Sequence, residues 1–381
     1  MHSNPFSDEE LARRLEATRA AMAGKGVEIA LFSAPENIFY LIGLDHWGYF
    51  APHVLVVPAE GDLLLITRAM EKVVIRNQVR NAAFLGHSDS ETAADVLIKH
   101  LGGAGRGKAI GYEAWSSGFS HAMGLKLRDG VQAKEWIDIS GLLDGLRNVK
   151  SPEEQHYMRL AAQAADAGTD AAIAACHDGA READVAAECL AAMTRAGGTP
   201  PGFGPFIRPA RRMAEEHTSW GDGLHAEAVF LEVAGCVARY NAPMGRLVSI
   251  GGIKDEDAAM AELSIKAFDA TLAALKPGAK ARDVYQGWQA VVDAAGMPEY
   301  RRHHCGYLVG IGFPPSWTGG PKVNGLRHDS DLEMQAGMTY HLMSWFTETG
   351  RGNFFVSNTV LLGPNGAEVL NRVPYGPHVT Q

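Results

Sequence analysis

The chain is 381 residues long, which exceeds one ordinary hydrophobic core and suggests two domains or three. Hydrophobic residues make up 46% and charged residues 21%, a composition typical of globular proteins. A formal net charge of −9 and the lack of long Lys/Arg runs argue against nucleic acid as a partner. No apolar stretch reaches the roughly 18 residues that a membrane-spanning helix needs, so no membrane partner is expected.

Cysteine usage and the start of the sequence indicate the compartment. The four cysteines are scattered and form no C-x-x-C pair, so neither a zinc knuckle nor a redox motif is indicated. The polar start M-H-S-N-P-F-S-D-E-E does not resemble a signal peptide. These features predict a soluble protein of a reducing compartment, the cytoplasm.

The first 145 or so residues alternate between helical and strand patterns. Residues 8–25 predict an amphipathic helix, and residues 29–33 a strand. Two apolar segments, 54–57 and 63–66, are joined by P-A-E-G-D, which predicts a hairpin. A further strand is expected at 109–112. The pattern indicates an α/β domain.

A capping box marks the start of a second domain. Ser151 precedes a proline at the first helical position, and Glu154 occupies the third position. An Ala-rich helix follows to about residue 177. We therefore place the domains at 1–147 and 148–381.

The second domain contains a weak internal repeat. Residues 179–185 read G-A-R-E-A-D-V and residues 278–284 read G-A-K-A-R-D-V. In each, Ala-Gly follows eleven and twelve residues after the Val, so a turn, a helix and its terminating Gly are used twice. We expect two related α+β halves whose strands face each other around a central cleft. Strand candidates 339–346 and 354–362 follow the helix of the second half.

One carboxylate lies inside an apolar run. Residues 228–236 read A-V-F-L-E-V-A-G-C, and their branched and aromatic side chains favour a strand with Glu232 inside it. A carboxylate there is costly unless it is paired, hydrogen-bonded, protonated or holding a cation. Buried ionisable groups cluster at functional sites, so Glu232 is a candidate site residue. The alternative is a structural ion pair with Arg239 or Arg246.

Several short motifs occur in a characteristic order. They are K-S-P-E-E at 150–154, L-K-P-G at 275–278, Q-A-G-M at 335–338 and V-P-Y-G-P near the end. In this order and spacing they resemble the creatinase and aminopeptidase P superfamily, over nearly the whole chain. The resemblance implies a creatinase-like α/β N-terminal domain followed by an α+β, pseudo-symmetric pita-bread catalytic domain.

The resemblance also bears on metal binding. Metal-dependent peptidases of this superfamily hold two divalent ions through two Asp, one His and two Glu. On this sequence those positions fall on Glu232, Pro243, Tyr307, Met343 and either Ser357 or Asn358. One carboxylate of five is left, whereas zinc needs at least three protein ligands and hard cations need several oxygens. We expect no metal, no other cofactor and no metallopeptidase chemistry.

Within the superfamily, the sequence resembles the ectoine hydrolases, which open a cyclic amidine. The similar segments are 231–240, 306–317, 337–343 and, in the first domain, 43–47. The loop 202–213 carries more Arg than that group implies, so the substrate stays open. The resemblance implies a metal-independent hydrolase of a C–N bond in a small amidine- or guanidine-type zwitterion.

Three residues are candidates for the chemistry. Glu232 would hold the amidinium or attack its central carbon, and a water activated by His217 is the alternative nucleophile. His341 would donate a proton to the leaving nitrogen. An amidinium already carries the charge that a metal would otherwise supply as a Lewis acid.

Aromatic and basic residues are candidates for substrate binding. Arg208 or Arg211 would bind a substrate carboxylate, or would instead pair with Glu215 or Glu216. Aromatic rings would surround the delocalised cation. The candidates are Trp47, Tyr49, Tyr240, Tyr307, Trp317 and Trp345.

The sequence leaves three alternative functions open, and the resemblance implies one oligomeric state. The alternatives are a creatinase-like amidinohydrolase, a metal-free pita-bread binding protein without catalysis, and an enzyme with one metal at Glu232, His217 and His341. Superfamily members commonly complete the pocket with the partner's N-terminal domain, which implies a homodimer. The aromatic cluster H-W-G-Y-F at 46–50 falls where such a lid would lie.

Overall fold

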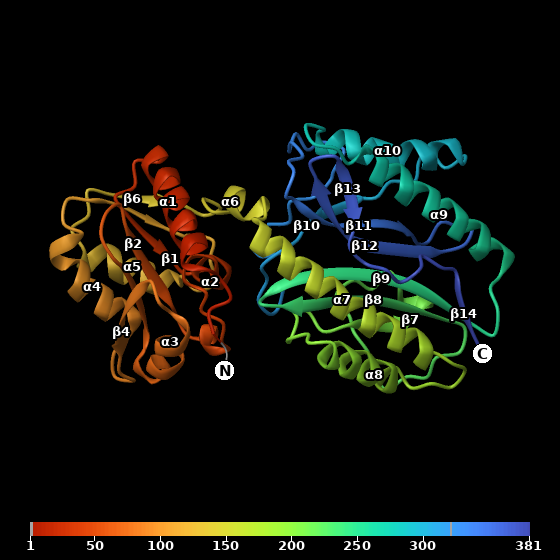
Figure 1. Ribbon diagram of the computed structural model, residues 1–381, viewed down its shortest axis with the longest axis horizontal. Coiled ribbons are helices and arrows are strands. Elements are labelled where there is room, and N and C mark those ends of the chain that lie inside the picture. Colours follow the sequence, from red (N-terminus) through yellow and green to blue (C-terminus); the bar gives the residue numbers. More distant parts are fainter. Residues whose placement is uncertain (1–2, 321) are drawn as a thin grey trace. The chain divides into compact units, whose positions relative to one another are not determined.

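The structure is a computed structural model, and it describes residues 3–320 and 322–381. The chain divides into two compact units, Met1–Arg147 and Asn148–Gln381 (Figure 1). Among the described residues, no helix combines the length and the apolar character that crossing a bilayer requires.

The first unit is an α/β layer structure around a six-stranded sheet in its described part, with strand order β4-β3-β2-β1-β5-β6. The strands are β1 Ile29–Phe32, β2 Val54–Pro58, β3 Leu63–Arg68, β4 Ala82–His87, β5 Ala109–Tyr112 and β6 Glu135–Asp138. The helices are α1 Asp8–Gly24, α2 Pro35–Ile42, α3 Lys72–Gln78, α4 Ala93–Ala104, α5 His121–Gly130 and α6 Asp144–Asn148, with short 3-10 helices η1 Gly48–Phe50 and η2 Ala69–Glu71. The predicted hairpin is confirmed, because β2 and β3 pair antiparallel.

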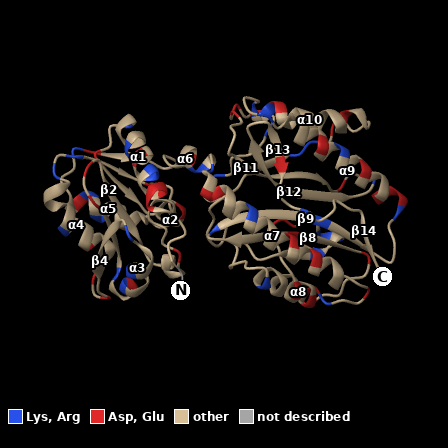
Figure 2. Ribbon diagram, in the orientation of Figure 1, with Lys and Arg blue, Asp and Glu red and all other residues tan. Residues whose placement is uncertain are grey.

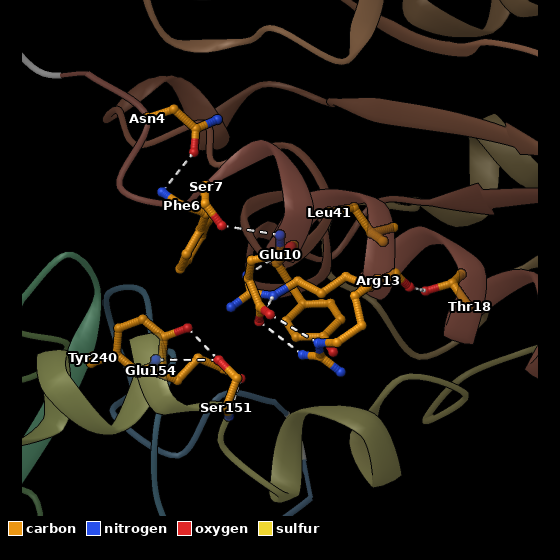
Figure 3. Close-up of polar contacts among 12 residues, drawn as sticks. Asn4, Phe6, Ser7, Glu10, Arg13, Thr18, Leu41, Ser151, Glu154 and Tyr240 are labelled. Atoms are coloured by element: carbon orange, nitrogen blue, oxygen red, sulfur yellow. Dashed lines mark hydrogen bonds and ion pairs between the residues drawn. The ribbon is translucent and has the colours of Figure 1, made fainter.

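The first helix begins where its polar residues place it. Ser7 caps α1, and its hydroxyl accepts the backbone N–H of Glu10 at 3.1 Å (Figure 3). The Glu10 carboxylate in turn accepts two hydrogen bonds from Arg13, each 2.8 Å long. A capped first turn with a carboxylate near the helix N-terminus is favourable for the helix dipole.

The second unit is built on a curved, mostly antiparallel sheet with the order β10-β11-β12-β9-β8-β7, with β13 and β14 pairing to β12 and β9. The strands are β7 Phe206–Pro209, β8 Ala228–Val237, β9 Tyr240–Ile250, β10 Gly306–Leu308, β11 Thr339–Phe346, β12 Phe354–Gly363, β13 Gly366–Val369 and β14 His378–Thr380. The helices are α7 Pro152–Ala175, α8 Glu182–Arg195, α9 Asp255–Ala274 and α10 Ala281–Ala294, with the 3-10 helix η3 Ala210–Arg212.

The capping box predicted at the start of this unit is confirmed. The Ser151 hydroxyl accepts the Glu154 N–H at 3.4 Å, and the Glu154 carboxylate accepts the Ser151 N–H at 2.9 Å (Figure 3). Both interactions satisfy donors that a helix start leaves open. Helix α7 therefore begins at the predicted residue.

The internal repeat corresponds to two similar halves. Helix α7 packs against β8 and β9 with α8 beside it, and α9 packs against β11 and β12 with α10 beside it (Figure 1). Helices α8 and α10 each have 14 residues and begin three residues after the Gly of the repeat. The predicted pseudo-symmetric pita-bread arrangement is confirmed.

The two faces of β8 have different roles. Val229, Leu231 and Val233 belong to a core cluster with side chains of α7 and α8. A Cβ at Gly235 would lie 2.0 Å from the Ala161 carbonyl oxygen, so glycine allows α7 to approach the sheet closely. Since side chains alternate along a strand, Glu232 points away from these helices.

Charge is rare in this sheet. The strands β7 to β12 are almost entirely uncharged in Figure 2, and their charged side chains are Arg208, Glu232 and Arg246. All three are buried. Each needs a partner or a function, because an isolated buried charge is strongly unfavourable.

Candidate active site

The second unit contains a cavity of about 340 Å³ into which β7, β8, β10 and β11 all contribute side chains. Its walls combine aromatic rings with two carboxylates and three imidazoles. The lining residues are Phe203, Phe206, Arg208, Glu216, His217, Glu232, His303, His304, Tyr307, Ser316, Trp317, Thr318, Gly320, Val323, Met343 and Trp345. This volume and this mixture are typical of a site for a small molecule.

Glu232 lies in the wall of this cavity with only 7% of its surface exposed. Burial raises the pKa of its carboxyl group from 4.5 to about 7, the neighbouring Arg208 opposes that rise, and Glu216 adds to it. The His341 ring nitrogen Nδ1 lies 3.9 Å from Glu232 Oε1. The carboxyl group therefore changes charge near neutral pH, where general bases and nucleophiles are effective.

The alternative of a structural ion pair for Glu232 is not supported. In the described part of the chain, Glu232 forms no ion pair with Arg239 or Arg246. The Arg246 guanidinium donates instead to the carbonyls of Gly245, Ser357, Val373 and Pro374 and to the Asn358 side chain. The Arg239 guanidinium lies 4.6 Å from the centre of the Phe313 ring.

Tyr307 in the cavity wall and His341 behind it form a buried hydrogen-bonded chain. They are opposite each other in β10 and β11, and the Tyr307 hydroxyl lies 2.9 Å from His341 Nδ1. The Trp317 indole N–H donates to the same hydroxyl at 2.9 Å, and His341 Nε2 lies 2.7 Å from the Ser357 hydroxyl. Burial raises the pKa of Tyr307 well above 10 and lowers that of His341 to about 3.

These protonation states leave two tautomers of His341. In one, Tyr307 donates to Nδ1 and Nε2–H donates to Ser357. In the other, Nδ1–H donates to Tyr307, whose oxygen then accepts two hydrogen bonds, which leaves the proton of this cavity-lining hydroxyl available for another acceptor. The second tautomer makes Tyr307 a hydrogen-bond donor for a bound molecule.

Tyr307 reaches the cavity, whereas His341 does not. His341 is fully buried, both of its ring nitrogens are engaged, and it is absent from the cavity lining. His341, predicted to donate a proton to the leaving nitrogen, thus lies behind Tyr307, whose hydroxyl separates its ring from the cavity.

His217 lies at the cavity on the loop that follows η3. Its ring stacks on Phe203, with 5.7 Å between ring centres, and its edge approaches Phe206. Its φ angle of 58° is in the left-handed region that non-glycine residues rarely adopt. Glu232 and His217 thus line one cavity.

Arg208 lines the cavity but does not present a free fork to a carboxylate. Its three guanidinium nitrogens donate to the backbone carbonyls of Arg212, Met213 and Thr218. The alternative prediction, an ion pair with Glu215 or Glu216, is also not seen: Glu215 pairs with Arg212 and Glu216 with Arg302. Arg211 does not line the cavity.

The aromatic candidates separate into two groups. Tyr307, Trp317 and Trp345 line the cavity. Tyr240 does not: its hydroxyl donates to Glu154 at 2.8 Å (Figure 3). Trp47 and Tyr49 belong to the first unit, where Trp47 has 63% of its surface exposed.

Several cavity residues were not anticipated. Burial lowers the pKa of His303 and lowers that of His304 to about 3, so both imidazoles are neutral at neutral pH. A signal was present in H-H-C-G-Y, where two His precede the strand of Tyr307 by a few positions. The other unanticipated lining residues are Phe203, Phe206, Glu216, Ser316, Thr318, Gly320 and Val323.

The positions of the superfamily's metal ligands offer few donors here. Glu232, Tyr307 and Met343 line the same cavity, but they supply one carboxylate, one phenol and one thioether. The Pro243 carbonyl accepts the Thr359 hydroxyl at 2.8 Å, so its only polar atom is used. This set does not fit two divalent ions, which need several oxygen or nitrogen ligands.

A single metal ion at Glu232, His217 and His341 does not fit either. The two nitrogens of His341 are bound to Tyr307 and Ser357. Within residues 3–320 and 322–381, no group of three or more His, Cys, Asp or Glu side chains is placed to hold a metal ion.

Known proteins share this architecture. Residues 156–364 match Metallopeptidase family M24, and residues 14–149 match the Creatinase/Prolidase N-terminal domain. Ectoine hydrolase from Halomonas elongata is 25% identical and covers 98% of each chain, and creatinase from a Bacillus species is 22% identical and covers 98% of this chain and 93% of its own. An Xaa-Pro dipeptidase structure from Bacillus anthracis superposes with a TM-score of 0.84 at 19% identity, covering 97% of this chain and 99% of that one.

A creatinase-type first unit and a pita-bread second unit with a polar-aromatic cavity define the class of fold. The chain belongs to metallopeptidase family M24, since the family match spans more than half of its length. The predicted superfamily and fold are thereby confirmed, and the relatives support a hydrolase of this family.

Proposed function

We propose that this protein is a metal-independent hydrolase of a C–N bond in a small amidine- or guanidine-type zwitterion, similar to ectoine hydrolase. The observation that carries the proposal is Glu232: a nearly buried carboxyl group, with a pKa of about 7, in an aromatic cavity without a metal-binding set around it. An amidinium supplies the positive charge that such a carboxylate would bind.

The cavity supports each step of such a reaction. Water adds to the amidinium carbon, one C–N bond breaks, and the products are an amide and a protonated amine. Glu232 attacks the carbon or holds the amidinium, and His217 removes a proton from the attacking water. The proton that His217 removes passes to the departing nitrogen, to which Tyr307 donates a hydrogen bond, with His341 and Trp317 fixing the position of its hydroxyl.

Two alternatives remain. A creatinase-like amidinohydrolase would use the same residues on a guanidino acid, which fits the creatinase relative. A binding protein without catalysis would keep the aromatic cavity but would have no need of a titrating carboxylate at its wall. Turnover of ectoine, hydroxyectoine, creatine and related amidines, followed by mass spectrometry, distinguishes the three.

Metal content is the first test. We expect the purified protein to hold less than one equivalent of transition metal and to keep its activity in chelator, because no three of the described His, Cys, Asp or Glu side chains are placed to hold a metal ion. Elemental analysis and turnover with EDTA measure this. Stoichiometric zinc, manganese or iron, with turnover that chelator abolishes, would contradict the metal-free mechanism.

We also propose a homodimer. On the first unit, Trp47 and Phe50 have 63% and 81% of their surfaces exposed, and an apolar surface of this kind commonly marks an interface. If the partner's first unit completes the pocket, Trp47→Ala is expected to weaken substrate binding while the melting temperature changes little. Sedimentation of the wild type tests the assembly, and a fully active monomer at micromolar concentration would refute it.

The four cysteines are free thiols, which fits the proposed cytoplasmic location.

A further inference from the structure

The Arg208 guanidinium donates hydrogen bonds to both ends of the loop 212–218. Arg208 lies on β7 with 1% of its surface exposed. Its Nε donates to the Arg212 carbonyl at 2.9 Å, and Nη2 donates to the Met213 carbonyl at 3.0 Å. Its Nη1 donates to the Thr218 carbonyl at 2.7 Å. One rigid group therefore closes the loop 212–218.

The loop that Arg208 closes carries two cavity residues. Glu216 and His217 lie between the Met213 and Thr218 carbonyls and line the cavity. His217 has a φ of 58°, a conformation that a non-glycine residue keeps only when its surroundings determine it. The loop's own bonds are short-range, such as the Thr218 hydroxyl donating to the Glu215 carbonyl. Beyond these, Glu216 pairs with Arg302 and the His217 ring lies beside Phe206 of β7, while Arg208 donates to backbone carbonyls at both ends of the loop.

We infer that Arg208 is a positioning residue: its guanidinium holds the loop 212–218 against β7 and so places His217 at the cavity. The role of His217 in the reaction rests on the proposed function, whereas the closure of the loop does not. A substrate carboxylate would have to compete for nitrogens that already serve three carbonyls.

Arginine suits this position better than lysine. Its planar fork reaches three acceptors in different directions, whereas an ammonium is a single point. The guanidinium also lies 4.4 Å from the centre of the Phe230 ring, which adds a cation–π contact. Arg208 has a second effect through its charge, because it holds the pKa of Glu232 lower than burial alone would set it.

Limited digestion with trypsin tests the loop closure. The loop region contains two cleavage sites, Arg211 and Arg212, whereas the bond after Arg208 precedes a proline and resists trypsin. We expect the wild type to resist cleavage at both sites, and Arg208→Lys to be cut there about tenfold faster. Arg211→Lys is the matched control: it makes the same substitution in the same segment, keeps a cleavage site, and is expected to behave as wild type.

Turnover separates positioning from charge. In Arg208→Lys we expect kcat to fall at least tenfold, while the pH dependence of kcat/KM stays in place because a positive charge remains. In Arg208→Gln the ionisation assigned to Glu232 is expected to move to higher pH, because the charge that opposed the rise is gone. A role limited to stability would lower the melting temperature of Arg208→Lys and leave its kcat unchanged.

Each outcome decides a part of the inference. Cleavage of Arg208→Lys at the wild-type rate, or ready cleavage of the wild type itself, overturns the loop closure. Faster cleavage with unchanged kcat overturns the placement of His217. If the wild type turns over none of the amidines, the proposed function fails, and the cleavage comparison still decides whether Arg208 holds the loop. If Arg208→Lys does not fold, Arg208→Gln takes its place in the cleavage comparison, and the same outcomes decide.

Discussion

Replacing Glu232 with Gln is expected to reduce turnover by at least two orders of magnitude, equivalent to about 2.7 kcal/mol of transition-state stabilisation. The substitution keeps the shape of the side chain and removes its charge. A nucleophile or an anchor for an amidinium depends on that charge. Steady-state kinetics on whichever amidine is turned over measures the effect.

Glu232→Gln is also expected to be more stable than the wild type above neutral pH. In the native state the pKa of Glu232 is raised from 4.5 to about 7, so the folded protein binds this proton more tightly than the unfolded chain. Stability therefore falls as the pH rises from about 4.5 to about 7, by roughly 3 kcal/mol in total. Glu232→Gln removes this loss, so its melting temperature should exceed that of the wild type at pH 8 and match it near pH 4.5.

Glu216→Gln is the matched control for this prediction, because it makes the same substitution in the same cavity. Glu216 is exposed and pairs with Arg302 at 3.6 Å, so its loss is expected to change turnover far less. Near-normal turnover of Glu232→Gln with a lowered melting temperature would make the carboxylate structural and remove it from the active site.

The predictability of Glu232 has a physical reason. A strand alternates its side chains between two faces, so one carboxylate in an apolar run is visible in the sequence as an exception. The same reasoning located β8, β11 and the start of α7, because hydrophobic period, capping residues and strand propensity are local properties. The repeat of turn and helix in the sequence likewise predicted the two similar halves of the second unit.

The partners of each polar residue were not predictable in the same way. The hydroxyl of Tyr240 binds Glu154, 86 positions away, and this contact takes it out of the cavity. The sequence marks His341 as a polar residue in an apolar strand, but only the pairing of β10 with β11 shows that Tyr307 stands in front of it. Arg208 was predicted to bind a carboxylate. Its actual acceptors are backbone carbonyls, and because every residue has one, no sequence pattern identifies them.

Removal of the Tyr307 hydroxyl is the second large expected effect. In Tyr307→Phe, the Trp317 indole N–H and His341 Nδ1 lose a shared partner, since both lie 2.9 Å from that oxygen. Each buried polar atom left without a partner costs roughly 1 to 3 kcal/mol. Turnover is expected to fall about 100-fold, because the departing nitrogen loses its hydrogen-bond donor.

Tyr340→Phe is the matched control for this variant. Tyr340 lies next to His341 on β11 but is on the other face of the strand, and its buried hydroxyl contacts the sulfur atoms of Met334 and Met338. Sulfur is a weak acceptor, so the loss of stability should be smaller. Turnover of Tyr340→Phe should equal that of the wild type.

Kinetics then separates the two roles of Tyr307. A donor that acts on the transition state lowers kcat and kcat/KM equally when it is removed, whereas a residue that only shapes the cavity raises KM. An unchanged kcat in Tyr307→Phe, together with a lowered melting temperature, would make Tyr307 a support for Trp317 and His341. The departing nitrogen would then be served by His217 alone, which faces the same cavity.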